Sequence, residues 1–403
     1  MSIIIMNDNA IDYEKVYAYR SAFEKWVNIA TRLNVSISAL NRWRVKVNFQ
    51  EPCRKINDDE VIEIVTKYVD TNKNQGERMC RSHIRSLNLY CTKLQITNAL
   101  NIVDPDGRIN RRLDHFTPTQ RQEYISKGPH NVWHMDGHHK LNDKKWKIVI
   151  HGAIDGFTRL IVFLKAGNSN SSKNVLKAFI NGIYANKHIN GKLPYSIRFD
   201  KGMENVLVAD LMIQFRGEGN DAVLVGKSIH NQRIERVWVD VKTNVVKYIE
   251  ELFIAMENDN SILLNRYDVN DIFCLHELFI PHINDKLNLF ITEWNHHMIS
   301  NINASPLQIL LNYEQLEPPI VICPPIEQFD HYLNNNIDIE DDPDSHMVHM
   351  DPIRNPFNTF DSYEYFKYQI DFNNAHININ DSKEDKLNKY KWVRALMYQI
   401  INQ

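Results

Sequence analysis

A change of hydrophobic periodicity near residue 129 constrains the fold of this chain more than any other feature. Before this point, apolar residues recur at the spacing of helices. After it, three stretches rich in β-branched and aromatic residues follow one another, at Val132–Met135, Trp146–Ile150 and Leu160–Leu164. Strands that follow directly on one another predict antiparallel neighbours, and Asp155-Gly156 predicts a hairpin between the second and the third.

Beyond these strands, the pattern alternates between helix and strand. The expected elements are a helix at about 172–186, a strand at Tyr195–Phe199, a helix at about 205–215, a strand at Ala222–Val225 and a long helix from Asn231. Three strands in series followed by this alternation predict a mixed five-stranded sheet flanked by helices, so the fold class is α/β. One more amphipathic helix is expected at 285–298.

The region before the sheet is predicted to be all helical. Within residues 13–46, Ser36 is placed to cap a short helix that carries Asn41, Arg42 and Arg44. A helix, a tight turn and a capped helix form the pattern of a helix-turn-helix, whose second helix can enter the major groove of DNA. Arg42 and Arg44 are therefore candidate DNA contacts. A plain helical hairpin gives the same pattern and stays open as the alternative.

Further helices are expected from Asn57 to Tyr68, at 79–87 and at 92–100, and a basic stretch of three arginines follows them. That stretch, Arg108, Arg111 and Arg112, is either a solvated linker or a phosphate contact. The predicted domains are a helix-turn-helix DNA-binding region at 1–112, a linker at 113–128, an α/β core with C-terminal helices at 129–326, and an acidic tail at 327–403. We expect partial disorder in this tail, because Asn and Asp are frequent in it.

The charge of the chain is small but unevenly distributed. A net charge of -3 over 403 residues gives no overall basic field. Residues 1–128 carry 20 Lys and Arg against 15 Asp and Glu, a balance of +5, whereas residues 327–403 carry 7 against 14, a balance of -7. A basic front and an acidic tail are compatible with a protein that binds nucleic acid.

Cysteine usage and hydropathy indicate the cellular location to expect for the protein. The 5 cysteines are scattered and form no C-x-x-C, which predicts reduced thiols rather than a disulfide framework or a structural zinc finger. The apolar opening Met1–Met6 is too short and uncharged for a signal peptide. No run approaches the roughly 20 apolar residues that span a bilayer. We therefore expect a soluble intracellular protein without a membrane partner.

Three acidic residues fall at the edges of the predicted elements. We predict that Asp136 ends the first strand and that Asp200 ends the fourth strand. Glu235 lies one turn into the helix that begins near Asn231, where its side chain can lean back toward the sheet. Their separations are 64 and 35 residues. Two strand ends and one helix start can bring three carboxylates to one edge of a sheet.

Convergent carboxylates repel one another, so they make chemical sense only around strongly charged cations. Oxygen ligands with open coordination positions suit Mg²⁺ or Mn²⁺. Two such ions, about 3.5–4 Å apart, can activate an attacking oxygen and stabilise a leaving oxygen in an in-line phosphoryl displacement. The three acids therefore predict a two-metal site for phosphoryl transfer.

At these residues the chain resembles the retroviral integrase and DDE transposase superfamily. The resemblance rests on Trp133-His134-Met135-Asp136, Asp155-Gly156-Phe157-Thr158-Arg159, Asp200-Lys201-Gly202-Met203-Glu204-Asn205 and His230-Asn231-Gln232-Arg233-Ile234-Glu235-Arg236. It continues in Trp294-Asn295-His296-His297 and Ser305-Pro306-Leu307-Gln308, and it covers about residues 129–312. More narrowly, the chain is similar to the stand-alone integrase-core proteins of eukaryotic transposable elements.

The resemblance implies an RNase H-like integrase core in which Asp136, Asp200 and Glu235 are the catalytic residues and the ligands of two Mg²⁺ or Mn²⁺ ions. It also implies the reaction, which is processing of DNA ends and strand transfer by a DDE-type polynucleotidyl transferase. The partners would be the ends of a mobile element and a target DNA, and joining two ends implies a homo-oligomer in the nucleus. On the helix of Glu235, three basic residues become candidate contacts to DNA ends: Arg233, Arg236 and Lys242.

Two further acids match family positions outside the triad. We expect Asp155 to belong to the hairpin and to pair with Arg159. We expect Glu204 to support Asp200 from nearby.

Other metal-dependent functions match the sequence less well. Several histidines surround Asp136, but the chain has no H-E-x-x-H, and the adjacent His138 and His139 would point apart on a strand, which disfavours a zinc hydrolase. The zinc module that often precedes retroviral integrases is also missing, because the candidate ligands have the wrong spacing: Cys80, His83, Cys91 and His115. Two alternatives stay open. One is a domesticated, catalytically silent protein that keeps the fold and binds nucleic acid, and the other is a ribonuclease H-like nuclease acting on RNA.

Overall fold

The computed structural model describes most of the chain, in two compact units. The described residues are 11–71, 75–105, 126–200, 202–217, 221–226, 231–259, 264–300, 302–313, 321–323 and 353–402. Those of the first unit fall within Met1–Asp70, Asn74–Gln122 and Thr292–Gln315, and those of the second within Thr71–Lys73, Glu123–Ile291 and Leu316–Gln403. The three arginines at 108–112, most of the predicted linker at 113–128 and the first part of the tail lie outside the described residues.

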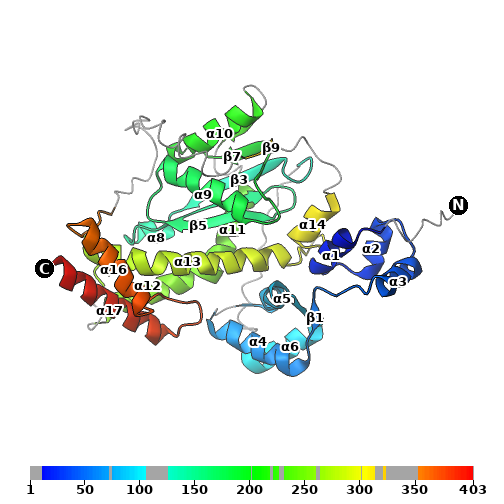
Figure 1. Ribbon diagram of the computed structural model, residues 1–403, viewed down its shortest axis with the longest axis horizontal. Helices are drawn as coiled ribbons and strands as arrows, with labels where there is room; N and C mark the ends of the chain where they lie inside the picture. Colours follow the sequence, from blue (N-terminus) through cyan, green and yellow to red (C-terminus); the bar gives the residue numbers. More distant parts are fainter. Residues whose placement is uncertain are drawn as a thin grey trace. The chain divides into compact units, whose positions relative to one another are not determined.

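The second unit is built on a mixed five-stranded sheet (Figure 1). Its strands are β3 (Val132–His138), β4 (Val149–Asp155), β5 (Ile161–Gly167), β7 (Ser196–Phe199) and β8 (Val223–Val225), in the spatial order β5-β4-β3-β7-β8. Strands β3, β4 and β5 pair antiparallel, whereas β7 runs parallel to β3 and β8 runs parallel to β7. The predicted α/β class, the mixed five-stranded sheet and the hairpin at Asp155-Gly156 are therefore confirmed.

Helices cover both faces of this sheet, and a glycine allows the close approach of one of them. On one face, α9 (Ser172–Ala185) comes so near to β5 that a Cβ on Gly182 would lie 2.4 Å from the Cβ of Phe163. On the other face lies α11 (Gln232–Val241), which packs against β3 and β4. Because the sheet is buried on both sides, β4 is an uninterrupted run of buried residues.

The remaining elements of the second unit surround this core. They are α8 (Lys140–Asp143), β6 (Lys192–Leu193), a 3-10 turn (Met203–Asn205), α10 (Val206–Arg216), a π-helical turn (Lys242–Val246), α12 (Lys247–Asn258), most of α13 (Val269–His296), β9 (Val321–Ile322), α16 (Phe360–Phe372) and α17 (Lys383–Ile401). The π-helical turn joins α11 to α12, so the long helix expected from Asn231 runs on to Asn258 with one wide turn inside it.

Two strand predictions need correction. The second strand, predicted at Trp146–Ile150, spans Val149–Asp155. It begins later than predicted because Lys145 and Lys147 adopt positive φ angles of 70° and 51° and hold Trp146 in a turn. The first strand does not end at Asp136. It continues to His138, since Gly137 and His138 pair with residues of β4.

Two helices also differ from expectation. The helix expected at 285–298 is the second half of α13, which begins at Val269 and contains Pro281. A proline inside a helix removes one backbone hydrogen bond, which is why the pattern predicted only the part after it. Residues 353–402 belong to the tail for which we expected partial disorder, and they contain the two helices α16 and α17.

The first unit contains two small helical groups. The first group is α1 (Tyr13–Ser21), α2 (Trp26–Arg32) and α3 (Ile37–Lys46), which enclose a core of Val16, Tyr19, Ile29, Ala30, Leu40 and Trp43. As predicted, the Ser36 hydroxyl caps α3 by accepting a bond from the N–H of Ala39 at 3.0 Å.

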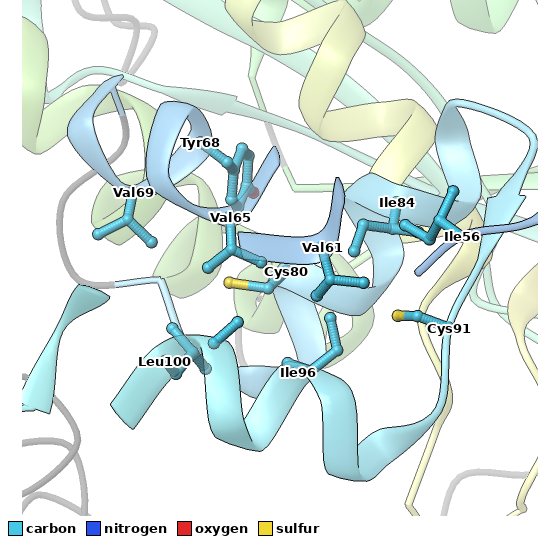
Figure 2. Packing of buried hydrophobic residues seen from close by; sticks show 11 residues of the cluster. Ile56, Val61, Val65, Tyr68, Val69, Cys80, Ile84, Cys91, Ile96 and Leu100 are labelled. Atoms are coloured by element: carbon cyan, nitrogen blue, oxygen red, sulfur yellow. The ribbon is translucent and has the colours of Figure 1, made fainter. Parts of the chain in front are cut away.

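The second group is α4 (Asp58–Thr71), α5 (Glu77–Ser86) and α6 (Lys93–Val103), with the short parallel strands β1 (Arg54–Lys55) and β2 (Leu89–Tyr90) beside them. Figure 2 shows the side chains of this core pointing toward one another, most of them from the three helices. Cys80 and Cys91 lie in it as apolar side chains, and all 5 cysteines of the chain are buried thiols that form no disulfide.

The end of α13 and the short α14 (Pro306–Tyr313) belong to the first unit as well. The buried carboxylate of Glu293 accepts from the Tyr68 hydroxyl at 2.6 Å and lies 2.8 Å from Nδ1 of His83. The side-chain amide of Gln308 donates to the carbonyl of Ala22 at 2.9 Å. Across the described residues of both units, none of the helices is long and apolar enough to cross a membrane.

Candidate active site

The pairing register of the sheet places Asp136 and Asp200 at the same level. Parallel pairing of β3 with β7 sets Val132 beside Ser196 and His134 beside Arg198, an offset of 64 residues. Asp136 and Asp200 are also 64 residues apart, and Asp200 follows directly after β7. The sequence separation of the two acids is therefore the register offset of the two strands, and both carboxylates lie toward the carboxyl ends of neighbouring parallel strands.

Glu235 approaches from α11, whose first residues are tied to β3 by Asn231. This N-terminal residue of the helix is buried, and its side-chain N–H donates to the carbonyl of Met135 at 2.8 Å. Its side-chain carbonyl accepts from Nδ1 of the buried His134 at 2.7 Å. Because Met135 directly precedes Asp136, these bonds fix the start of the helix beside one acid, and Glu235 lies in the first turn of that helix.

The three carboxylates interact electrostatically. Burial raises the pKa of Asp136 to about 7, and the neighbouring charges of Glu235 and Asp200 act in the same direction. Desolvation and the charge of Asp200 also raise the pKa of Glu235. The structure thus brings the three predicted acids to one place, where each charge disfavours the others.

The donor set fits a divalent cation in its chemistry. Three carboxylates that repel one another are stabilised by hard cations with oxygen ligands. Within the described parts of the chain, however, no three His, Cys, Asp or Glu side chains are gathered tightly enough to hold one ion as they stand. The acids are therefore neighbours across one edge of the sheet rather than a closed cage.

The two acids outside the triad have different surroundings. The buried carboxylate of Asp155 accepts from the N–H of His130 at 3.0 Å, and from the N–H and hydroxyl of Thr158 at 2.8 and 2.6 Å. With Arg159, the expected partner, it shares a backbone hydrogen bond of 2.9 Å. Burial and the charge of Asp200 raise the pKa of Glu204, which places Glu204 near Asp200, as expected.

The predicted DNA contacts differ in their solvent exposure. On α11, Arg233 is half-buried, whereas Arg236 is exposed and lies 3.4 Å from Asp240. Lys242 is exposed at the start of the π-helical turn.

On α3, Arg42 is exposed, but the guanidinium of Arg44 lies 4.4 Å above the ring of Trp26 and 4.0 Å from Glu51. The two arginines therefore lie on different faces of the helix.

Sequence reasoning missed the roles of two residues at this site. Asn231 belongs to the motif His230–Arg236, but only the folded structure reveals its hydrogen bonds to β3. Trp238 donates its indole N–H to Oδ2 of Asp136 at 2.7 Å. Its signal in the sequence, an aromatic residue three positions after Glu235, is also what an ordinary core residue would give.

The sheet has three antiparallel strands followed by two parallel ones, and the acids lie toward the carboxyl ends of the parallel pair β3 and β7. This arrangement defines an RNase H-like α/β fold. A family model described as an integrase core domain matches residues 124–316. This segment therefore belongs to the integrase core family, the catalytic core of the retroviral integrase and DDE transposase superfamily, as its motifs predicted. None of the curated proteins compared with the chain matches it.

Proposed function

We propose that this protein is a metal-dependent DNA integrase or transposase, which processes DNA ends and joins them to a target. The observation that carries the proposal is the convergence of Asp136, Asp200 and Glu235 at one edge of an integrase core sheet. Proteins of this family generally use divalent metals. Three neighbouring carboxylates repel one another, and a cation bound between them offsets this repulsion.

In this proposal, Asp136, Asp200 and Glu235 hold two Mg²⁺ or Mn²⁺ ions. Bound ions of this kind activate an attacking oxygen and neutralise the charge on a leaving one. The fold positions these ligands. The pairing register of β3 and β7 sets the two aspartates side by side, and Asn231 holds the start of α11 against β3.

The DNA end would lie along α11, whose basic residues are the proposed phosphate contacts. Arg236 and Lys242 are exposed there, and Arg233 is on the first turn beside Glu235. Phosphate contacts of this kind position DNA without reading its sequence.

We propose that α3 of the first unit recognises the base sequence of the DNA. The helix exposes one continuous stripe that is polar and basic apart from two aliphatic side chains: Ile37, Ser38, Asn41, Arg42, Val45 and Lys46. Leu40 and Trp43 on the other side are buried in the core of the first helical group. A major groove accepts a helix with such a face, because Arg pairs with guanine, Asn pairs with adenine and apolar atoms contact thymine methyl groups. Arg44, held by Trp26 and Glu51, is the weaker candidate.

The role of α3 is tested by Arg42→Gln in a DNA-binding titration by fluorescence anisotropy. We expect binding to the preferred sequence to weaken at least about 5-fold, since a bidentate base contact contributes roughly 1–3 kcal/mol. Lys15→Gln is the matched control, because it removes one exposed positive charge from α1 in the same helical group. An equal loss of affinity in both variants would show that only the positive charge matters, and it would contradict base recognition by α3.

The catalytic proposal is tested by Mg²⁺-dependent cleavage and strand transfer on oligonucleotide substrates. The wild type is expected to nick and join DNA, and Asp200→Asn to lose at least about 1,000-fold of this activity. Asp210→Asn is the matched control, since Asp210 is exposed on α10. DNA that is bound but never cut by either protein would favour the catalytically silent alternative, and preferential cleavage of RNA or hybrid duplexes would favour the nuclease alternative.

Two expectations complete the proposal. Concerted joining of two DNA ends requires more than one active site, so we propose a homo-oligomer on DNA. Its substrates are chromosomal and element DNA, so we propose a nuclear location.

A further inference from the structure

We propose that Trp238 is a positioning residue, which holds the carboxylate of Asp136 in the orientation that receives a metal ion. The inference rests on the proposed function and adds to it a residue that carries no charge. The Trp238 indole N–H donates to Oδ2 of Asp136 at 2.7 Å, a short bond to an acidic group. A backbone bond from Gly137 also reaches the Asp136 carboxyl. Since a carboxylate offers about four acceptor positions, further lone pairs remain for a cation.

An indole suits this task for a chemical reason. Its N–H donates a hydrogen bond but has no lone pair to accept one or to bind a cation. It therefore engages one side of the carboxylate without competing for the ion. The terminal torsion of an aspartate is otherwise broad, so a fixed donor selects one orientation of its two oxygens. Without it, repulsion from Glu235 and Asp200 favours an orientation that turns away from them.

The surrounding sheet holds the indole in place. Trp238 is 6% exposed, and its ring lies 5.3 Å from that of His138 on β3. Gly152, the cross-strand partner of Asp136, makes the space, because a Cβ there would lie 3.0 Å from the Trp238 ring and 2.5 Å from Leu164. The two residues that face each other across β3 and β4 thus provide the carboxylate and the room for its donor.

The helix links the donor to a second acid. Trp238 lies three residues after Glu235 on α11, so both side chains extend from the same side of the helix. His134, Asp136 and His138 alternate along β3 and share one face, and the first and last of them contact Asn231 and Trp238. A displacement of α11 along the strand would therefore move Glu235 and the donor of Asp136 together.

The chain offers a matched control at Trp146. Its indole N–H also donates to a carboxylate, Oε1 of Glu257 at 2.8 Å, and its side chain is fully buried. This bond belongs to the same unit but involves none of the three acids. Trp238→Phe and Trp146→Phe thus remove the same chemical group from two comparable places.

The first test is a calorimetric titration of full-length protein with Mn²⁺. Residues that orient metal ligands typically contribute 10- to 100-fold to affinity, so we expect Trp238→Phe to weaken Mn²⁺ binding about 10-fold and Trp146→Phe to leave it unchanged. Failure of the wild type to bind Mn²⁺ would overturn the metal site itself. Binding by the wild type that Trp238→Phe retains in full would overturn the role of Trp238 alone.

A second readout follows the hydrogen bond directly. The protein has 7 tryptophans, and the indole N–H resonance of Trp238 is assigned by its loss in Trp238→Phe. We expect this resonance to shift upfield in Asp136→Ala and to shift when Mg²⁺ is added to the wild type, while that of Trp146 stays in place. A Trp238 resonance that responds to neither change would overturn the inference, whatever the stability of the variants.

Discussion

Aspartates that resemble one another in the sequence have different roles in this fold. Asp136 lies half-buried beside two other carboxylates, and its pKa rises to about 7 mainly through burial. Asp155 lies one strand away and is fully buried, but its carboxylate is surrounded by N–H and O–H donors from His130 and Thr158. The first arrangement calls for a cation, and the second is satisfied by the protein alone. Asp155 therefore secures the β4–β5 hairpin.

Asp155→Ala tests this difference at the scale of one residue. We expect the free energy of unfolding of the second unit to fall by about 2–4 kcal/mol, because three buried donors lose their acceptor. Mn²⁺ affinity should be unchanged when measured below the unfolding transition. Asp210→Ala, at an exposed position, should affect neither quantity. A stable Asp155→Ala protein that fails to bind Mn²⁺ would instead assign Asp155 to the metal site.

At the scale of elements, α17 is fixed to the start of α13 by a buried charge. The carboxylate of Asp271 is fully buried and accepts two bonds from the Arg394 guanidinium, at 2.6 and 3.2 Å. The hydroxyl of Tyr398 donates to the same carboxylate at 3.2 Å. These partners lie 123 and 127 residues from Asp271, so the order of residues 353–402 depends on contacts that no local pattern contains.

Arg394→Met should therefore destabilise the second unit strongly. Leaving the buried Asp271 charge without its cation costs about 3–5 kcal/mol, and the double variant with Asp271→Asn should recover part of this loss. Lys391→Met is the control, because Lys391 is exposed on the same helix. Denaturation midpoints in urea give the comparison. Equal stability of Arg394→Met and Lys391→Met would contradict a buried anchor.

The difference between local sequence signals and contacts with residues far along the chain explains which parts of the fold and the site could be predicted. The helix α3 followed from its Ser36 cap, and the acids followed from a separation that equals the register offset of β3 and β7. The extent of β4 did not, because Gly152 interrupts its apolar pattern to make room for Trp238. Likewise, Pro281 concealed the first half of α13. Predictions therefore failed where a residue such as Gly152 serves a partner far along the chain, and where a proline breaks the pattern within a helix.

At the scale of the whole second unit, buried histidines set the response to acid. Burial lowers the pKa of six of them to about 3 or 4: His130, His134, His138, His151, His276 and His282. In the unfolded chain they bind protons near pH 6.5, so falling pH favours unfolding from there down to about pH 4. Acids with raised pKa values act in the opposite direction but are fewer: Asp136 and Asp155, at about 7 and 6, and Glu204, Glu235 and Glu277.

The second unit should thus lose stability steadily between pH 6.5 and 4. Each histidine contributes a slope of about 1.4 kcal/mol per pH unit. His282→Leu should reduce the total slope by that amount, because His282 is fully buried and neither of its ring nitrogens has a hydrogen-bond partner among the described residues. Met256→Leu, which changes a buried side chain of the same unit without a titratable group, should leave it unchanged. Urea denaturation at several pH values measures the slope, and an unchanged slope in His282→Leu would refute this explanation.

The claim on which the function depends is that Asp136, Asp200 and Glu235 act together as one metal site. Crystals of the full-length protein grown with Mn²⁺ test it most directly, through the anomalous scattering of the ion. We predict anomalous peaks in contact with carboxylate oxygens of all three acids, and their loss in Asp200→Asn crystals. Mn²⁺ bound elsewhere, or bound without Glu235 and Asp200, would contradict the proposed active site.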